Sequence, residues 1–177
     1  MSFTESYPAQ YESNLTLRDG SVVFLRPIKA TDGDLVIDLV EMLSSNSKYL
    51  RFLRSLDSLS ENLLYQLTHV NYRSEFALVA TINEGGNEKI IAVARYAYSS
   101  EDNNTELAVT VRDDWQHRGL GKSLLERIVE IGKEHGISQY VAIIAPQNKI
   151  IINTLIKLGY NVNCSLKSGI FHVEIAV

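Results

Sequence analysis

The sequence contains little cysteine and no long apolar run, and both absences bear on where the protein works. Cys164 is its single cysteine, so no internal disulfide can form, and residues 1–10 lack the charged and apolar blocks of a secretion signal. None of the apolar stretches approaches the roughly 18 residues that a membrane span requires. We therefore expect a soluble protein of the reducing cytoplasm with no membrane partner.

An excess of positive charge is also absent. The formal net charge is -4 and the pI is near 5.6, whereas a dedicated nucleic-acid binder needs a basic face that releases counterions from the phosphate backbone. The four histidines show no metal-ligand spacing. Neither a nucleic-acid partner nor a bound metal is therefore expected.

Internal repeats, low-complexity tracts and Pro/Gly/Ser-rich linkers are missing as well, which argues against several domains. The 177 residues, 45% of them apolar, suffice for one compact domain with a proper core. We expect an N-terminal arm over residues 1–14 and a single domain over residues 15–177.

The chain does contain an ordered series of strand and helix signals. Asp19-Gly20 marks a hairpin turn, and Gly85-Gly86 marks a second one. The expected strands lie within residues 14–28, 75–82, 89–98, 105–111, 139–145, 160–166 and 170–177, and the expected helices within residues 31–53, 60–67, 119–136 and 148–159. A meander of strands followed by strand, helix, strand and helix predicts an α/β (α+β) fold.

The stretch "DDWQHRGLGKSLLE", residues 113–126, places two glycines and several cations between an expected strand and an expected helix. A Walker A loop would need a glycine where Gln116 stands, and a later strand should end in an aspartate, but "YVAIIAP" does not. A dinucleotide fingerprint would need a glycine at Leu124. Both alternatives are disfavoured.

Gln116-x-x-Gly119-x-Gly121, which we call the phosphate loop (residues 116–121), can bind a pyrophosphate directly. Amides at a helix N-terminus have no partner inside the helix and carry about half a positive charge. The glycines let a ligand touch the backbone. The expected phosphate-binding residues are Gln116, His117, Arg118, Gly119, Leu120, Gly121, Lys122 and Ser123.

This pattern resembles the acyl-CoA-binding motif of the GNAT acetyltransferase superfamily, Gln/Arg-x-x-Gly-x-Gly/Ala at a strand-to-helix junction. Asn148, followed by Gly159-Tyr160, and Glu106 before the phosphate loop match the superfamily in order and spacing. The resemblance implies the GNAT fold, a central mixed, mostly antiparallel twisted sheet flanked by helices, with acetyl-CoA as acetyl donor. It also implies that Val109, Thr110 and Val111 contact the donor through their backbone, and that Asn148 belongs to the donor site.

Further segments, "FLRPIKATDGD", "SSNSKYLRFL" and "YRSEFALVA", are similar to the GNAT domain of Pat-type protein lysine acetyltransferases. Those enzymes typically acetylate acetyl-CoA synthetase and related acyl-CoA ligases. The resemblance implies a protein lysine of an acyl-CoA synthetase as acceptor. Acetylation of a small amine is the alternative within the same superfamily.

Acetyl transfer from a thioester needs a neutral amine, and Glu106 is the expected general base. On a strand it shares a face with Ala108 and Thr110, and we expect it in a partly dry cleft, with Glu75 as a second candidate. Many members of the superfamily have a tyrosine general acid where this chain has Leu155. A catalytically silent acyl-CoA-binding regulator therefore stays a further alternative. Cys164 is read as a small buried residue and not as a nucleophile.

Overall fold

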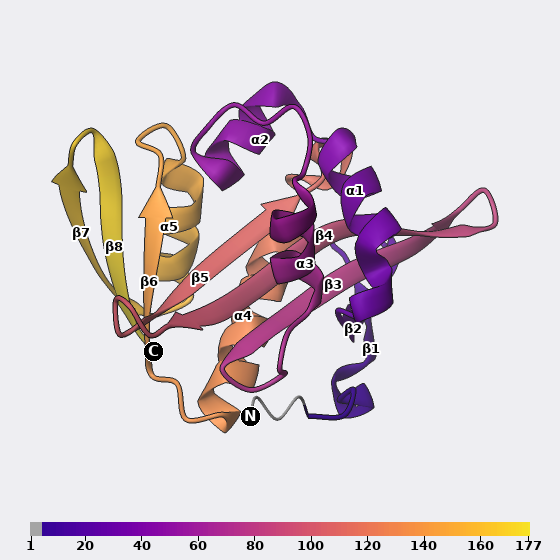
Figure 1. Ribbon diagram of the computed structural model, residues 1–177, viewed down its shortest axis with the longest axis horizontal. Helices are drawn as coiled ribbons and strands as arrows, with labels where there is room; N and C mark the ends of the chain where they lie inside the picture. The colour runs from indigo at the N-terminus through magenta and orange to yellow at the C-terminus, as the bar shows by residue number, and fades with distance from the viewer. Residues whose placement is uncertain (1–4) are drawn as a thin grey trace.

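The computed structural model describes residues 5–177, and its elements are arranged as one sheet with helices on both faces (Figure 1). The strands are β1 (Ser13–Thr16), β2 (Val22–Pro27), β3 (Glu75–Glu84), β4 (Asn87–Ser99), β5 (Asn104–Val111), β6 (Gln139–Ile144), β7 (Asn161–Lys167) and β8 (Ile170–Ala176). The helices are α1 (Gly33–Glu41), α2 (Ser45–Phe52), α3 (Glu61–Thr68), α4 (Leu120–Glu134) and α5 (Lys149–Lys157), with short 3-10 turns at Ala9–Tyr11, Ala30–Asp32 and Asp113–Trp115.

The eight strands form one sheet in the order β1-β2-β3-β4-β5-β6-β8-β7. All neighbouring pairs are antiparallel except β5 and β6, which are parallel and pair only where Glu106 faces Val141. Beyond that point the two strands separate, as their arrows do in Figure 1. The expected α/β (α+β) fold with a mixed, mostly antiparallel sheet is confirmed.

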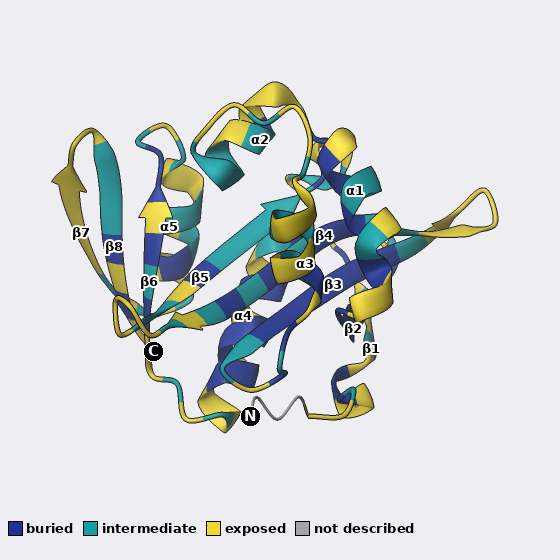
Figure 2. Ribbon diagram, in the orientation of Figure 1, coloured by how far each residue is buried: buried dark blue, intermediate teal, exposed yellow. Residues whose placement is uncertain are grey.

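The helices divide between the two faces of the sheet. α4 packs against β3, β4 and β5 on one face, and α1 packs against β4 and α3, with α2 against β5, on the other. Alternation along the strands assigns Tyr96 and Leu107 to the α4 face and Arg95 and Glu106 to the opposite one. Buried residues follow β3, β4 and α4, whereas β7 is largely exposed (Figure 2).

The sequence signals locate these elements closely. Asp19-Gly20 lies in the β1–β2 turn and Gly85-Gly86 in the β3–β4 turn, where both glycines have positive φ. Gly136 follows the C-cap of α4 with φ 81°, and His135 is the C-cap residue, as a helix dipole favours. Within the described residues, no helix combines the length and apolarity needed to traverse a bilayer.

The helix expected over residues 31–53 is divided into α1 and α2, and the described part of the expected N-terminal arm, residues 5–14, contributes to the core. Residues 1–4 lie outside the described part of the chain. Tyr11 is buried against Phe76, with ring centroids 5.4 Å apart, and donates a hydrogen bond of 2.6 Å to Glu134. β1 then begins at Ser13. The packed domain therefore starts before residue 15, because an aromatic side chain in the preceding segment is part of the core.

Candidate functional site

The phosphate loop connects the end of β5 to the start of α4. Gly119 is the N-cap residue of α4 with φ 85° and ψ 0°, a left-handed conformation that glycine adopts without strain. In residues 5–177, the backbone amides of Leu120, Gly121 and Lys122 have no hydrogen-bond acceptor, while the amide of Ser123 donates to the Gly119 carbonyl. Three amides at the positive end of a 15-residue helix are therefore available to an anion.

Side chains hold this loop in place from three directions. Gln116 donates hydrogen bonds to the Val111 carbonyl (2.9 Å) and to the Ser47 hydroxyl (3.3 Å). Arg118 pairs with Asp19 in the β1–β2 turn at 3.0 Å, and its guanidinium lies 4.4 Å from the Trp115 ring centroid. Gln116 and Arg118, both expected to contact phosphate, thus also fasten the loop to β5 and to the β1–β2 turn.

Arg18, in the β1–β2 turn, is a cation at this site that sequence reasoning missed. A Cβ placed on Gly119 would lie 3.3 Å from Arg18 Nε, so the guanidinium is directly beside the loop. Lys122, in the first turn of α4, and His117 are exposed at the same junction. No local sequence pattern identifies Arg18 as part of this site, because Arg18 lies about a hundred residues before Gly119 in the sequence.

Asp113 joins the loop to α2. Its carboxylate accepts hydrogen bonds from the Ser44 amide (2.9 Å), the Ser44 hydroxyl (2.8 Å) and the Ser47 hydroxyl (2.9 Å). Burial by itself raises the pKa of Asp113, but these hydrogen bonds outweigh it, and the net pKa lies below its ordinary value. The ionised carboxylate therefore fixes the start of α2 next to the phosphate loop.

The gap between β5 and β6 exposes backbone groups of β5. The Arg112 amide bonds to Ile91 of β4, so alternation directs the backbone groups of Thr110 toward β4 and those of Val109 and Val111 away from it. β6 does not pair with these residues. Of the three expected contacts, Val109 thus presents its amide and carbonyl to the gap, and Val111 presents its amide, because the Val111 carbonyl is bonded to Gln116. Thr110 instead directs its side chain to the face of the sheet that carries α1 and α3.

Glu106 and Glu75 lie in one row across the sheet. Both pair in register with Ala97, Glu75 from β3 and Glu106 from β5, so the three side chains share a face. Neither carboxylate forms an ion pair or side-chain hydrogen bond with another residue between 5 and 177. Glu106 is exposed, which corrects the expectation that it lies in a partly dry cleft. α2 and α3 cover the neighbouring row of side chains and leave the row that contains Glu106 open to solvent.

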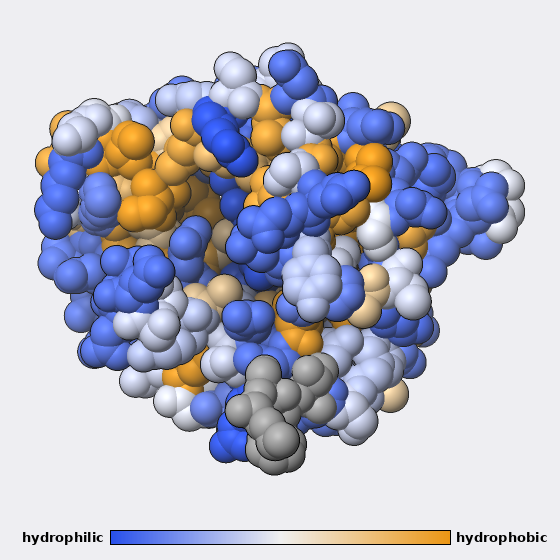
Figure 3. Space-filling model, viewed as in Figure 1, coloured by the Kyte–Doolittle hydropathy of each residue, from blue (hydrophilic) through white to orange (hydrophobic). Residues whose placement is uncertain are grey.

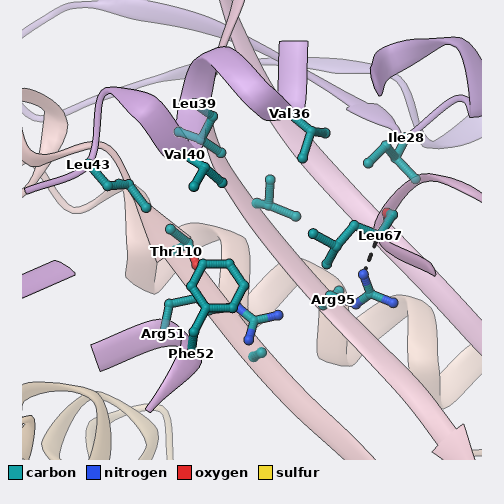
Figure 4. A pocket seen from close by; sticks show the side chains of 12 residues that line it. Ile28, Val36, Leu39, Val40, Leu43, Arg51, Phe52, Leu67, Arg95 and Thr110 are labelled. Atoms are coloured by element: carbon teal, nitrogen blue, oxygen red, sulfur yellow. Dashed lines mark hydrogen bonds between the residues drawn. The ribbon is translucent and has the colours of Figure 1, made fainter. Parts of the chain in front are cut away.

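A small pocket of about 40 Å³, partly open to solvent, adjoins this row on the same face of the sheet (Figure 4). Apolar side chains of α1 and α3 form most of its wall, and Ala108 and Thr110 of β5 form part of its floor. Arg51 and Phe52 of α2 and Arg95 of β4 complete it. Burial lowers the pKa of Arg51, with the Glu106 carboxylate opposing the shift, and burial together with the charge of Arg51 lowers the pKa of Arg95 to about 10.

Three further residues singled out in the sequence have defined positions. Asn148 is the N-cap residue of α5, and its side chain makes no capping hydrogen bond. Leu155 is fully buried in the core and cannot serve as a proton donor. Cys164 is exposed on β7, contrary to the expectation that it is buried, because β7 is an edge strand. It shares a sheet face with Val173 and Ala142, opposite to that of Glu106.

The surface on the α1–α3 side is hollowed beside the β6–β8 end of the sheet, where apolar side chains gather at the upper left of Figure 3. Ile143 of β6 and Leu166 of β7 are among the exposed large apolar residues.

Within residues 5–177, no group of three or more His, Cys, Asp or Glu side chains is arranged to hold a metal ion.

A splayed pair of parallel strands lies next to a helix that begins on glycines, so exposed strand backbone and free helix amides meet at one end of the sheet. The family model described as the acetyltransferase (GNAT) family matches residues 40–160, and the chain belongs to that family. This confirms the family resemblance seen in the phosphate loop.

Individual relatives agree with this assignment. The chain is 29% identical to an acetyltransferase of Pseudomonas aeruginosa over 82% of its own length and 78% of that protein. It is 29% identical to the acetyltransferase Pat of Mycolicibacterium smegmatis over 81% of its own length, but it spans 42% of that protein. The crystal structure of the GNAT domain of S. lividans PAT superposes with a TM-score of 0.86 at 31% identity, covering 97% of this chain and 100% of that domain.

Proposed function

We propose that this protein transfers the acetyl group of acetyl-CoA to a lysine side chain of another protein, and that an acyl-CoA synthetase is its acceptor. Family membership supports acetyl transfer. Among structures that share the fold, a Thermoplasma acidophilum N-acetyltransferase contains coenzyme A and a Salmonella typhimurium protein contains acetyl-CoA. The similarity to two Pat proteins supports the acceptor.

The observation that carries the proposal is the arrangement along β5. Glu106 presents a carboxylate that has no ion-pair partner among residues 5–177, Val109 and Val111 turn backbone groups toward the β5–β6 gap, and the phosphate loop follows at the end of the strand. A donor whose pyrophosphate lies on the free amides of residues 120–122 can extend its pantetheine arm along that gap. Its thioester then lies near Val109, within reach of an amine at Glu106.

The reaction follows from this placement. The lysine amine attacks the thioester carbon, a C–N bond forms, and a backbone amide of β5 stabilises the developing oxyanion. The C–S bond then breaks and the CoA thiolate leaves, while the proton of the amine passes to Glu106, directly or through one water molecule. Exposure of Glu106 leaves room for the acceptor lysine to approach.

We place the reaction in the cytoplasm, in agreement with an exposed cysteine that has no disulfide partner.

A CoA-release assay with an acyl-CoA synthetase as acceptor tests the proposal. Glu106→Gln should keep the Kd for acetyl-CoA and lower kcat by about 10²- to 10⁴-fold, the usual contribution of a general base, with the greater loss at lower pH. Glu41→Gln, at the exposed end of α1, is the matched control and should retain full turnover. Full turnover by Glu106→Gln would contradict the assignment of the base. Acetylation of small amines alone, with no protein product, would contradict the acceptor.

A further inference from the structure

Four arginines inside the core or at its edge differ in their partners. Arg26 pairs with Asp32 and Glu88, and Arg112 pairs with Asp114 and Glu84. Arg51 and Arg95, by contrast, form no ion pair with any residue in the range 5–177. A buried or half-buried guanidinium is normally paired, because an uncompensated charge in a partly dry site costs free energy. The exceptions therefore require a reason.

Arg51 and Arg95 come from different elements but reach the same space. Both line the pocket beside Glu106, and Figure 4 shows their guanidinium groups directed over the sheet between α2 and α3. Arg95 makes only long hydrogen bonds, of 3.5 Å to the Leu67 carbonyl and 3.4 Å to the Gln66 carbonyl. Several of its N–H groups, and those of Arg51, remain available to an acceptor from outside the chain.

Arg95 is close enough to Glu106 for one molecule to contact both residues. Arg95 is opposite Ala108, and Glu106 is opposite Ala97, so Arg95 and Glu106 are diagonal neighbours on one face with Cα atoms roughly 7–8 Å apart. An amine at Glu106 and an anion at the two arginines can therefore belong to one acceptor. Planar guanidinium groups favour a carboxylate, which they bind with two parallel hydrogen bonds.

We infer that Arg51 and Arg95 form a carboxylate-binding subsite that selects an acceptor amine with a carboxylate close to it. The inference rests on the proposed transfer to an amine at Glu106 and adds a determinant of acceptor choice. In a protein acceptor the carboxylate is an acidic side chain near the modified lysine, and in a free amino acid it is the acceptor's own carboxylate. Both sources offer the same group to the same pair of arginines.

Matched acceptors test the subsite. Lysine peptides with a neighbouring Glu are compared with the same peptides carrying Gln, and free amino acids are compared with their carboxamides. The wild type should favour the carboxylate form by roughly 10- to 100-fold in kcat/KM, the range for hydrogen bonds to a charged group. If the enzyme prefers the Glu peptide to the Gln peptide, the carboxylate belongs to a protein acceptor. If it prefers the free amino acid to its carboxamide, the carboxylate belongs to a free amino acid.

The variants are Arg95→Gln and Arg51→Gln. The control is Arg54→Gln, because Arg54 is exposed just after α2 and forms no ion pair within the part of the chain that the structure describes. Each Gln variant of the pair should reduce the carboxylate preference to near unity, and Arg54→Gln should keep it. An unchanged acetyl-CoA Kd shows that the variants are folded. Arg95→Lys, which keeps the charge but not the planar fork, should retain part of the preference.

Binding of the same peptides to the CoA-loaded protein, measured by calorimetry, separates this inference from the proposed function. If no acceptor releases CoA but binding still favours the Glu peptide and loses that preference in Arg95→Gln, the proposed function fails and the subsite stands. Equal binding and turnover of both peptide forms by the wild type overturns the subsite. A preference for succinyl-CoA over acetyl-CoA that is lost in Arg95→Gln also overturns it, because the arginines would then bind the donor.

Discussion

Replacing Gly119 and Gly121 by alanine, one at a time, should change the stability of the protein in opposite directions. Gly119 has φ 85° and ψ 0° at the N-cap of α4, and Gly121 is the second residue of that helix with an ordinary conformation. The two glycines are two residues apart in the phosphate loop. They therefore separate the need for a left-handed backbone from the need for a small side chain.

The magnitudes follow from the local geometry. Alanine at Gly119 is strained in the left-handed region by roughly 1–2 kcal/mol, and its Cβ would meet only the flexible Arg18 side chain at 3.3 Å. Alanine at Gly121 would make an ordinary contact of 3.5 Å with Val111 Cγ2. It should stabilise the helix by roughly 0.5–1 kcal/mol. The free energies of unfolding of the two variants should thus differ by roughly 1.5–3 kcal/mol.

Urea denaturation and calorimetric titration with acetyl-CoA measure both effects. Gly119→Asn is the diagnostic third variant, because asparagine tolerates the left-handed conformation and should recover most of the lost stability. Its side chain still occupies the space between the loop and Arg18, where we place the pyrophosphate. Its affinity for acetyl-CoA should therefore fall at least roughly tenfold, equivalent to about 1.4 kcal/mol. Equal destabilisation by both alanines, or unaltered affinity in Gly119→Asn, would refute this reasoning.

Four other changes should affect stability in defined ways. In the described part of the chain the buried Tyr140 hydroxyl has no hydrogen-bond partner, so Tyr140→Phe should raise the free energy of unfolding by about 1–3 kcal/mol. Gly132→Ala should lower it, because the added Cβ would collide with that hydroxyl. Arg26→Met leaves Asp32 buried without its bidentate partner and should cost about 3–5 kcal/mol, measured by urea denaturation. Because the folded pKa of Asp113 is lowered, its contribution is fully present above its ordinary pKa of 3.8 and is lost as the pH falls through the folded pKa. Asp113→Asn should remove this part of the acid dependence in thermal unfolding between pH 2 and 6, and an unchanged pH profile would argue against the Asp113 contacts with α2.

Local signals in the sequence predict the elements and the phosphate loop well. Asp19-Gly20 defines a hairpin turn through glycine's positive φ. Gln116, Gly119 and Gly121 define a helix start with free amides. The hairpin turn and the helix start can be predicted because each depends on residues that are close together in the chain. Family resemblance then identified Glu106 as the expected base. That role remains a prediction.

Contacts between distant segments could not be predicted in this way. Arg18 reaches Gly119 because the β1–β2 turn folds against the start of α4, and no pattern near either residue encodes that approach. The presence of Arg51 and Arg95 in one pocket depends on α2 packing against β5, next to β4. The exposure of Cys164 likewise depends on the strand order, which leaves β7 at the edge of the sheet.

Tandem mass spectrometry of an acyl-CoA synthetase, after incubation with acetyl-CoA and either the wild type or Glu106→Gln, would show whether the protein acetylates a lysine of that acceptor and whether Glu106 is the base. We expect acetylation of a defined lysine by the wild type, and loss of that modification with Glu106→Gln at equal acetyl-CoA occupancy. An equally acetylated lysine with both proteins, or no acetylated lysine with the acetyl-CoA-loaded wild type, would contradict this expectation.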